Sequence, residues 1–348
     1  MRLGLLCLVI GSVAFASNSK LAPPSKNTPV PFDADLFRRD AQVISGHGEF
    51  LYWRVQEGAL DYALKMRGQA WGPTPSYAQG VFKNGTFNGD PGFRLAMSFF
   101  RAPKYWEVKW QYTRLTAAGS NSANAPTAAN QFLTGTWPQL IATPLRKARS
   151  YLHLNYNTAD LLVDRFFNPN PHLRLRLIGG GTVAWMNQDW NIYYSNALGQ
   201  ASHVRNRWKY VGGGFRVGTM VDWYWGLDVY VTALATTGLL MGSYQNQAEQ
   251  TTSMAVDAAD NPSIPVRHSK YQDVRSVYTL QFYFGPSYQK NFTNNRIEVF
   301  LGYEINSWFN IHEVYRSTAS TAAASKETWI NGSGIALQGL TTRLTVDF

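Results

Sequence analysis

The sequence predicts an all-β protein that folds as a single antiparallel transmembrane β-barrel of the outer-membrane type, with about 12 to 16 strands. Three observations lead to this prediction. Apolar and polar residues alternate in segments from Gly46 to Phe348, many tryptophans lie near the segment ends, and the last segment ends in an aromatic residue. Alternation with a period of two is typical of strands that are buried on one face.

The composition excludes a disordered chain and a helical membrane protein. The 348 residues are 45% hydrophobic and 16% charged, and they include 12 Trp, 19 Tyr and 19 Phe. Aromatic surface in this amount can bury a core, which disordered chains cannot do. Apart from the segment Leu3 to Ala16, no stretch approaches the roughly 18 apolar residues of a membrane-spanning helix.

The net charge is positive, but it does not indicate nucleic-acid binding. Lys and Arg number 32 against 22 Asp and Glu, a formal charge of +10. The basic residues occur singly within strand-like segments, whereas phosphate-binding proteins cluster them. Nucleic acid is therefore not expected as a partner.

The N-terminus resembles a secretory signal peptide. Arg2 precedes the apolar run Leu3 to Val13, and Ala14 to Ala16 fits a cleavage site of the A-x-A type. We therefore divide the chain into a signal peptide (1–16), a proline-rich tether (17–44) and a barrel (45–348). The sole cysteine, Cys7, lies in the signal peptide, so the exported chain would contain no disulfide.

Strand length and the tryptophans favour a membrane barrel over a soluble β-sandwich. The alternating segments reach the about 9–11 residues of a tilted membrane strand, whereas globular strands have about 5–6. Aromatic rings favour the water–lipid boundary. The tryptophans near segment ends are Trp53, Trp106, Trp185, Trp208, Trp223, Trp225 and Trp308.

The C-terminal segment fits the closing strand of a barrel. Leu344, Val346 and Phe348 share one face, while Arg343, Thr345 and Asp347 share the other. A last strand that pairs with the first leaves no open sheet edge. We expect the barrel-assembly machinery and outer-membrane lipid as partners of such a chain.

The strand number follows from the length. About 300 residues, at roughly 20 per strand with its connection, give ~14 strands, and single-chain bacterial barrels usually have an even number. Two long segments, Thr116 to Lys147 and Tyr244 to Tyr271, are expected to be external connections. The first carries Phe132, Trp137 and Leu140, which we expect to constrict the pore, to cover the rim, or to contact a neighbouring copy in a homo-oligomer.

Charged residues within the alternating segments are candidates for lining the pore, because lipid-facing positions exclude charge. We expect either a basic lumen with a weak anion preference, or a mixed-charge, unselective pore with the surplus positive charge on external loops. The candidates are Arg54, Arg94, Lys109, Arg174, Arg176, Arg275, Arg296, Arg343, Glu107, Glu298 and Glu304.

No enzymatic or metal-binding motif is recognisable. The six histidines show no H-x-x-x-H spacing, and Ser150, three residues before His153, lacks a G-x-S-x-G context. We therefore expect no catalytic residues, no metal site and no cofactor.

Short motifs in a fixed order resemble the Legionella-type pore-forming outer-membrane proteins, a family of major-outer-membrane-protein-like porins also found in chlamydia-related bacteria. The similarity covers about residues 46 to 348, and the tether departs from it. The resemblance implies a pore-forming barrel without catalytic residues. The motifs include GEFLYWR (48–54), GALDYA (58–63), GFRVG (214–218), GLLMG (238–242) and LQGLT (337–341).

These observations predict an outer-membrane porin of a Gram-negative bacterium. It would let small hydrophilic solutes diffuse through a water-filled pore. Two alternatives stay open at this point: a structural or adhesive surface barrel with a plugged pore, and a secreted β-domain that binds carbohydrate through its tryptophans.

Overall fold

The computed structural model describes residues 42–67, 80–101, 105–128, 131–137, 141, 144–170, 172–253, 264–292, 295–317, 327–331 and 334–348. The expected signal peptide and the tether up to residue 41 lie outside the described residues. The first strand begins at Gln42, inside the segment expected to be tether. Within the described ranges, no helix is long and apolar enough to cross a membrane.

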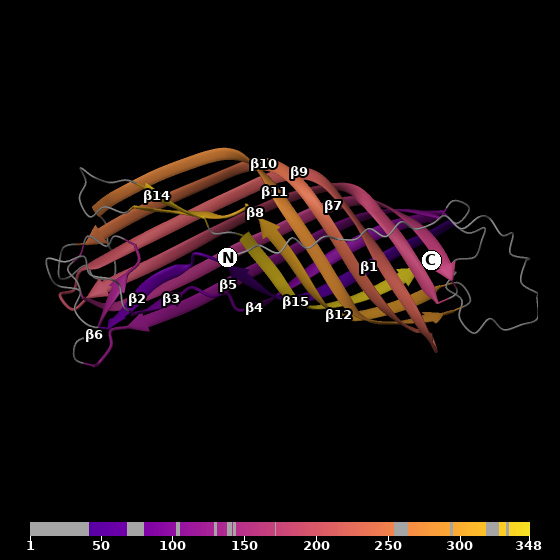
Figure 1. Ribbon diagram of the computed structural model, residues 1–348, viewed down its shortest axis with the longest axis horizontal. Coiled ribbons are helices and arrows are strands. Elements are labelled where there is room, and N and C mark those ends of the chain that lie inside the picture. The colour runs from indigo at the N-terminus through magenta and orange to yellow at the C-terminus, as the bar shows by residue number, and fades with distance from the viewer. Residues whose placement is uncertain are drawn as a thin grey trace, which may run out of the picture. The chain divides into compact units, whose positions relative to one another are not determined.

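Ten antiparallel strands form a closed ring (Figure 1). Their order around the ring is β7, β5, β4, β1, β15, β12, β11, β10, β9 and β8, and β8 pairs with β7 to close it. Closure leaves these strands without an open edge. The ring strands are β1 (Gln42–Glu57), β4 (Gly89–Arg101), β5 (Trp106–Asn124), β7 (Leu145–Asn170), β8 (Leu173–Asn196), β9 (Ala201–Gly226), β10 (Val229–Ser253), β11 (Ile264–Asn291), β12 (Arg296–Phe309) and β15 (Gly334–Asp347).

Ten strands are fewer than the 12 to 16 expected from the length. The reason is that β7 to β11 each have 24 to 28 residues, whereas about 9–11 suffice to cross a bilayer. Parts of both expected external connections are strand, including Thr116–Asn124 in β5 and Tyr244–Ser253 in β10. The expectation of 12 to 16 strands was wrong because it counted the extra strand length as connection.

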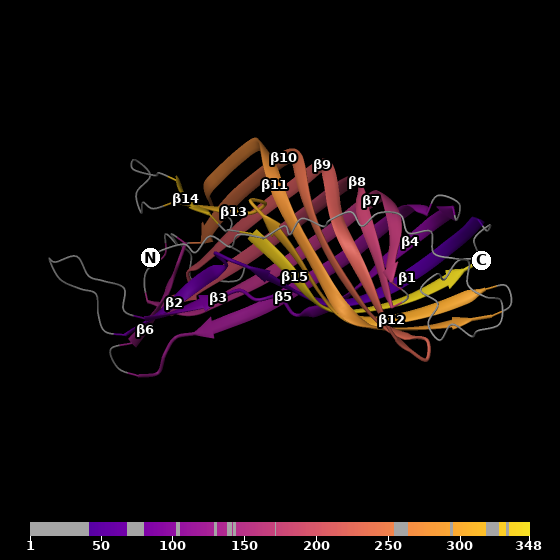
Figure 2. The same ribbon diagram turned by 45° about the vertical axis from the view of Figure 1, so that its right-hand side comes forward.

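The two ends of the ring differ in their connections. Both chain ends of the barrel, with the short links β4–β5, β7–β8, β9–β10 and β11–β12, lie at one end, which we name the terminus end. The opposite loop end carries β2 (Asp61–Arg67), β3 (Gly80–Asn84) and β6 (Gln131–Gly135), and the small sheet of β13 (Glu313–Ser317) and β14 (Glu327–Asn331) (Figures 1 and 2). In bacterial barrels short turns face the periplasm and long loops face outward.

The apolar face of the long strands changes sides along their length. On β9, Val211, Phe215 and Val217 face outward in the part that leads to the terminus end, and they are exposed. Towards the loop end the outward side carries Arg207 and Lys209. We name the part of the ring with an apolar outer face the membrane half and the rest the loop half. Where a strand leaves the lipid and enters water, its outward face becomes polar and its inward face becomes apolar. We call this change the exchange of faces.

This exchange places the tryptophans in two environments. Trp106, Trp185, Trp223 and Trp225 face outward and are exposed, as expected for the lipid boundary. Trp53, Trp208 and Trp308, expected at the same boundary, are instead buried inside the ring. They belong to strand segments whose interior is apolar.

The closing strand lies where the C-terminal pattern predicts. β15 pairs with β1 and β12, and the Phe348 amide donates a hydrogen bond to the Ile44 carbonyl at 2.9 Å. Leu344 and Phe348 face outward and are exposed, and Val346 shares their face. That the assembly machinery binds this strand stays a prediction.

The outer face of the membrane half can be tested with one substitution. Val217 faces outward near the middle of the apolar segment of β9, so Val217→Arg is expected to lower the free energy of unfolding by about 2–4 kcal/mol in lipid. Gln245→Arg, on the outer face of the loop half, is expected to change it by less than about 0.5 kcal/mol. Urea titrations followed by gel mobility compare the two. Equal losses would contradict a lipid-facing Val217.

Candidate functional site: the charged lumen

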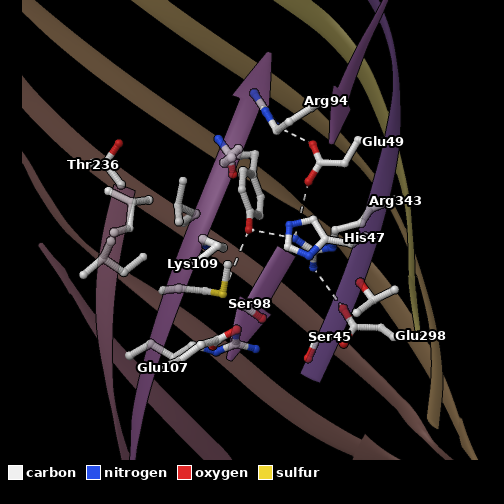
Figure 3. A pocket seen from close by; sticks show the side chains of 18 of the residues that line it. Ser45, His47, Glu49, Arg94, Ser98, Glu107, Lys109, Thr236, Glu298 and Arg343 are labelled. Carbon is white, nitrogen blue, oxygen red and sulfur yellow. Dashed lines mark hydrogen bonds and ion pairs between the residues drawn. The ribbon is translucent and has the colours of Figure 1, made fainter. Parts of the chain in front are cut away.

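The lumen of the membrane half contains a polar cavity, whose empty volume of about 790 Å³ includes space open to solvent. Every one of the ten ring strands contributes to its wall, which includes Ser45, Ser98, Thr236 and Tyr283. Figure 3 shows Glu49, Arg94, Lys109, Glu298 and Arg343 converging on this space from different strands. The cavity is therefore the lumen of the barrel and not a pocket between loops.

Arg94 holds together the end of the cavity nearer the loop half. Its guanidinium bonds to Glu304 at 2.8 Å and to Glu49 at 2.5 Å. Glu304 also accepts hydrogen bonds from Gln281 at 2.6 Å and Thr341 at 2.9 Å. Charge-assisted bonds of this kind are stronger than neutral ones, so five strands are linked across the lumen.

A second ion-pair group lies towards the terminus end. Arg343 bonds to Glu298 at 2.9 Å and to the Tyr283 hydroxyl at 3.1 Å. Arg296 pairs with Asp347. These contacts connect β11, β12 and β15, and Glu49 lies between Arg94 and Arg343 (Figure 3).

Asp222 is the centre of a third group, close to the terminus end. It accepts hydrogen bonds from Arg174 and Arg176, both at 2.9 Å, and from Thr232 at 2.8 Å. Asp222 is fully buried and Arg174 nearly so. One carboxylate therefore compensates two enclosed guanidinium groups.

Two more carboxylates are buried behind the cavity wall. Asp160 pairs with Arg216 at 3.3 Å and accepts a hydrogen bond from Gln111 at 3.2 Å. Asp164 lies 3.6 Å from the Lys109 ammonium. Among the described residues, the interior of the membrane half holds seven basic and eight acidic side chains, a formal balance of −1. They are Arg94, Lys109, Arg174, Arg176, Arg216, Arg296 and Arg343, with Glu49, Glu107, Asp160, Asp164, Asp222, Glu298, Glu304 and Asp347.

Most of the expected pore-lining residues are found inside the ring. Those on the cavity wall are Arg94, Lys109, Arg176, Arg296, Arg343, Glu107 and Glu298. Arg174 and Glu304 are buried in the ion-pair groups beside the cavity. Arg275 faces inward in the loop half, where it pairs with Asp273 and Glu313. Arg54 was expected inside, which is wrong: it faces outward and is exposed, because β1 has exchanged its faces before this position.

Several interior residues were not anticipated from the sequence. Glu49, Asp160, Asp164, Arg216 and Asp222 each pair with a partner in the lumen. Asp160 and Asp164 flank the run Leu161 to Val163, which shows no alternation. Arg216 and Asp222 continue the inward register of β9, and that register was the signal that could have revealed them.

An apolar core fills the lumen of the loop half. It includes Trp190, Trp208, Trp308 and Tyr156 from the ring strands. Segments outside the ring contribute to the same core through Leu133, Trp137, Ile311 and Val314, which we name the plug. The plug belongs to this apolar core, which lies on the loop side of the charged cavity.

Of the residues expected to constrict the pore, Trp137 packs edge-on against Trp190, with ring centroids 5.8 Å apart. Phe132 is half-buried on β6. Leu140 lies outside the described residues. The structure therefore places Trp137 inside the lumen, one of the positions that the sequence left open.

The described residues assemble no recognisable catalytic or metal centre. Ser150 faces inward and accepts a hydrogen bond from Trp190 at 2.8 Å, whereas His153 faces outward on the same strand. No group of three His, Cys, Asp or Glu side chains in the described ranges could hold a metal ion.

A closed antiparallel ring with an apolar outer segment and a charged interior defines a transmembrane β-barrel. The chain belongs to the family of the Legionella pneumophila major outer membrane protein precursor, whose family model matches residues 45–348. It is accordingly an outer-membrane protein, as the sequence predicted, and the predicted family resemblance is confirmed.

Several solved structures are similar to this chain at low sequence identity. The outer membrane protease OmpT from Escherichia coli is 12% identical, with 88% of this chain and 96% of that chain covered and a TM-score of 0.42. A Pseudomonas aeruginosa FadL homologue is 9% identical, covers 89% and 90%, and has a TM-score of 0.19. The Pseudomonas putida toluene transporter TodX is 6% identical, covers 88% and 89%, and has a TM-score of 0.21. No curated protein matches the sequence.

Proposed function

We propose that this protein is a narrow pore of the outer membrane for ions and small hydrophilic solutes, and that it is closed in the conformation described. The observation that carries the proposal is the charged cavity, to which all ten ring strands contribute. Ion pairs that are buried contribute little net stability, because removing two charges from water costs about as much as their attraction returns. Charged groups at membrane depth are therefore more often functional than structural.

The ring size limits what such a pore could pass. Side chains fill barrels of about eight strands, whereas barrels of about 16–18 strands hold an aqueous channel. A ring of ten is closer to the first case. Among the small hydrophilic solutes that the sequence suggested, this favours ions and the smallest molecules.

Two barriers in series account for closure. The ion pairs of Arg94 cross the lumen at one level, and the plug fills it at the next. Ion pairs can exchange partners without leaving the barrel, and the plug comes from segments that are not ring strands. Opening would therefore need movement of the plug and rearrangement of side chains, while the ring stays intact.

A structural surface barrel is the second candidate. It is supported by the apolar core, which is continuous across the loop half. A barrel that never opens has the same outer face and the same closing strand, so electrical measurements must separate the two functions.

Wetting the plug should increase conductance. Leu133→Ser with Trp137→Ser removes apolar side chains from the plug, and we expect more frequent and longer openings in planar bilayers than for the unchanged protein. Val81→Ser with Phe82→Ser is the matched control, because both residues are exposed on β3, and it should behave like the unchanged protein. Complete silence of the unchanged protein and of the plug variant, with folded gel mobility for both, would support the structural barrel.

We also propose a weak anion preference for the open pore. The side chains on the cavity wall include six basic and four acidic groups, whereas Arg174 and the four carboxylates behind the wall bring the whole interior to a formal balance of −1, so the proposal rests on the wall alone. Screening over about 8–10 Å at physiological salt reduces the effect further. Reversal potentials under a KCl gradient should be small and of anionic sign. A cationic sign would contradict this proposal without affecting the pore itself.

A further inference from the structure

The outer face carries a ring of residues where the apolar segment ends. On each ring strand we take the first outward-facing residue on the loop side of the apolar segment. We name this set of residues the boundary ring. Three members are basic: Arg54 on β1, Arg114 on β5 and Lys209 on β9. The others are neutral: Pro91, Asn157, Asn187, Ser243, Ser276, Ser307 and Gln338. No member of the boundary ring is acidic.

The three basic side chains are free to bind a ligand. All three are exposed, and none forms an ion pair or a side-chain hydrogen bond with the part of the chain that the structure describes. The next outward positions on β9 differ in this respect. There Arg205 pairs with Asp189, and Arg207 lies 3.4 Å from Glu249. The carboxylates of Asp189 and Glu249 are therefore already paired with Arg205 and Arg207, and they leave Lys209 unpaired.

Aromatic residues place the boundary ring at the edge of the lipid. Tyr52 and Tyr112 each lie two residues before a basic member, on the same outward face. The Tyr112 ring stacks on Trp185, with centroids 5.9 Å apart and planes 18° apart. Tyr and Trp prefer the interface between hydrocarbon and headgroups. The basic groups therefore lie at the level of lipid headgroups on the loop side.

The loop side of such a barrel faces outward, so its boundary ring meets the outer leaflet. Anionic headgroups attract interfacial Lys and Arg, and guanidinium groups bind phosphate through two parallel hydrogen bonds. Asn187, Gln338 and the Ser members can exchange hydrogen bonds with sugar hydroxyls, whereas Asn157 is buried and accepts a hydrogen bond from the Tyr112 hydroxyl. Arg54 and Arg114 lie on the two strands that flank β4, whereas Lys209 lies on β9 in another part of the ring.

We propose that Arg54, Arg114 and Lys209 bind the phosphate groups of an anionic saccharolipid in the outer leaflet. This site lies on the outer wall, so it does not depend on whether the lumen conducts.

Lipid A with and without its phosphates tests the proposal. The barrel in neutral detergent is mixed with either form, and the unfolding temperature is read from heat-dependent gel mobility. Bisphosphorylated lipid A should raise this temperature more than the dephosphorylated form does. The triple variant R54Q/R114Q/K209Q should unfold like the unchanged protein without lipid. It should lose the difference between the two lipids, with an affinity about fivefold weaker for each residue replaced.

A matched control removes three exposed basic residues from the outer face at the terminus end, Arg101, Arg165 and Lys290, as R101Q/R165Q/K290Q. This control should keep the full phosphate-dependent difference. Equal stabilisation by both lipids, or an equal loss in both triple variants, would overturn the proposal. An equal rise with inorganic phosphate alone would also overturn it, because the site would then bind a free anion.

Discussion

Replacement of Asp222 by Asn is expected to lower the free energy of unfolding by about 3–5 kcal/mol. Asn keeps the shape of the side chain but removes the charge that compensates Arg174 and Arg176. Asp222 is 0% exposed, so water cannot replace it. The loss comes from leaving two guanidinium groups enclosed without a counter-charge.

Asp228→Asn is the control for this substitution. Asp228 is exposed in the β9–β10 turn at a φ of 63°, a conformation that Asn adopts readily. Urea titrations followed by gel mobility should show a change below about 0.5 kcal/mol for the control. A loss at Asp222 no larger than at Asp228 would show that the Asp222 ion pairs do not hold this end of the lumen together.

Trp53→Ala is expected to cost about 3–5 kcal/mol, the range for removing a large aromatic side chain from a core. Trp53 is 0% exposed inside the ring. Its indole N–H donates to Thr341 at 3.1 Å, and the Arg94 guanidinium lies 5.5 Å from its ring centroid. The residue thus joins the apolar core to the charged lumen.

Trp106→Ala is the comparison, because Trp106 is 41% exposed on the outer face. It should lose less than half as much stability in the same unfolding measurement. If the two variants lost the same stability, Trp53 would lie at the lipid boundary, as a uniform barrel pattern predicts, and the exchange of faces would be wrong.

The sequence was sufficient for the fold class because a barrel repeats one simple constraint. Alternation in the membrane half of each strand reports lipid on one side and polar groups on the other, so Arg94, Lys109 and Arg343 were placed inside correctly. The closing strand followed from the same rule applied to Leu344 and Phe348.

The exchange of faces was not predicted, although the sequence contains a signal for it. Where a strand leaves the membrane, the alternation breaks and two apolar residues become adjacent, as at Tyr210 and Val211 on β9. Because this break was not recognised, Arg54 and Trp53 were assigned to the wrong sides of the wall. The same oversight made the strands too short and therefore too numerous.

The ion-pair partners could be predicted only in part. Which carboxylate meets which guanidinium depends on the stagger of ten strands, and Asp222 meets Arg174 across the β8–β9 register. Sequence fixes the side of each residue once the register is known, but it does not supply the register between neighbouring strands.

Outside the bilayer, the apolar core of the loop half holds the strands together, and the loop tips form the surface that faces the medium. These two tasks therefore fall to different parts of the chain. Shape outside the bilayer is maintained by Trp190, Trp208 and their neighbours inside the wall, so the tips between strands are not needed to hold the strands together. Since lengthening a loop costs little entropy, the tips can change in length and sequence while the wall beneath them stays rigid. A molecule approaching the cell therefore meets loop tips that can tolerate changes in sequence, carried on a wall that the apolar core holds together.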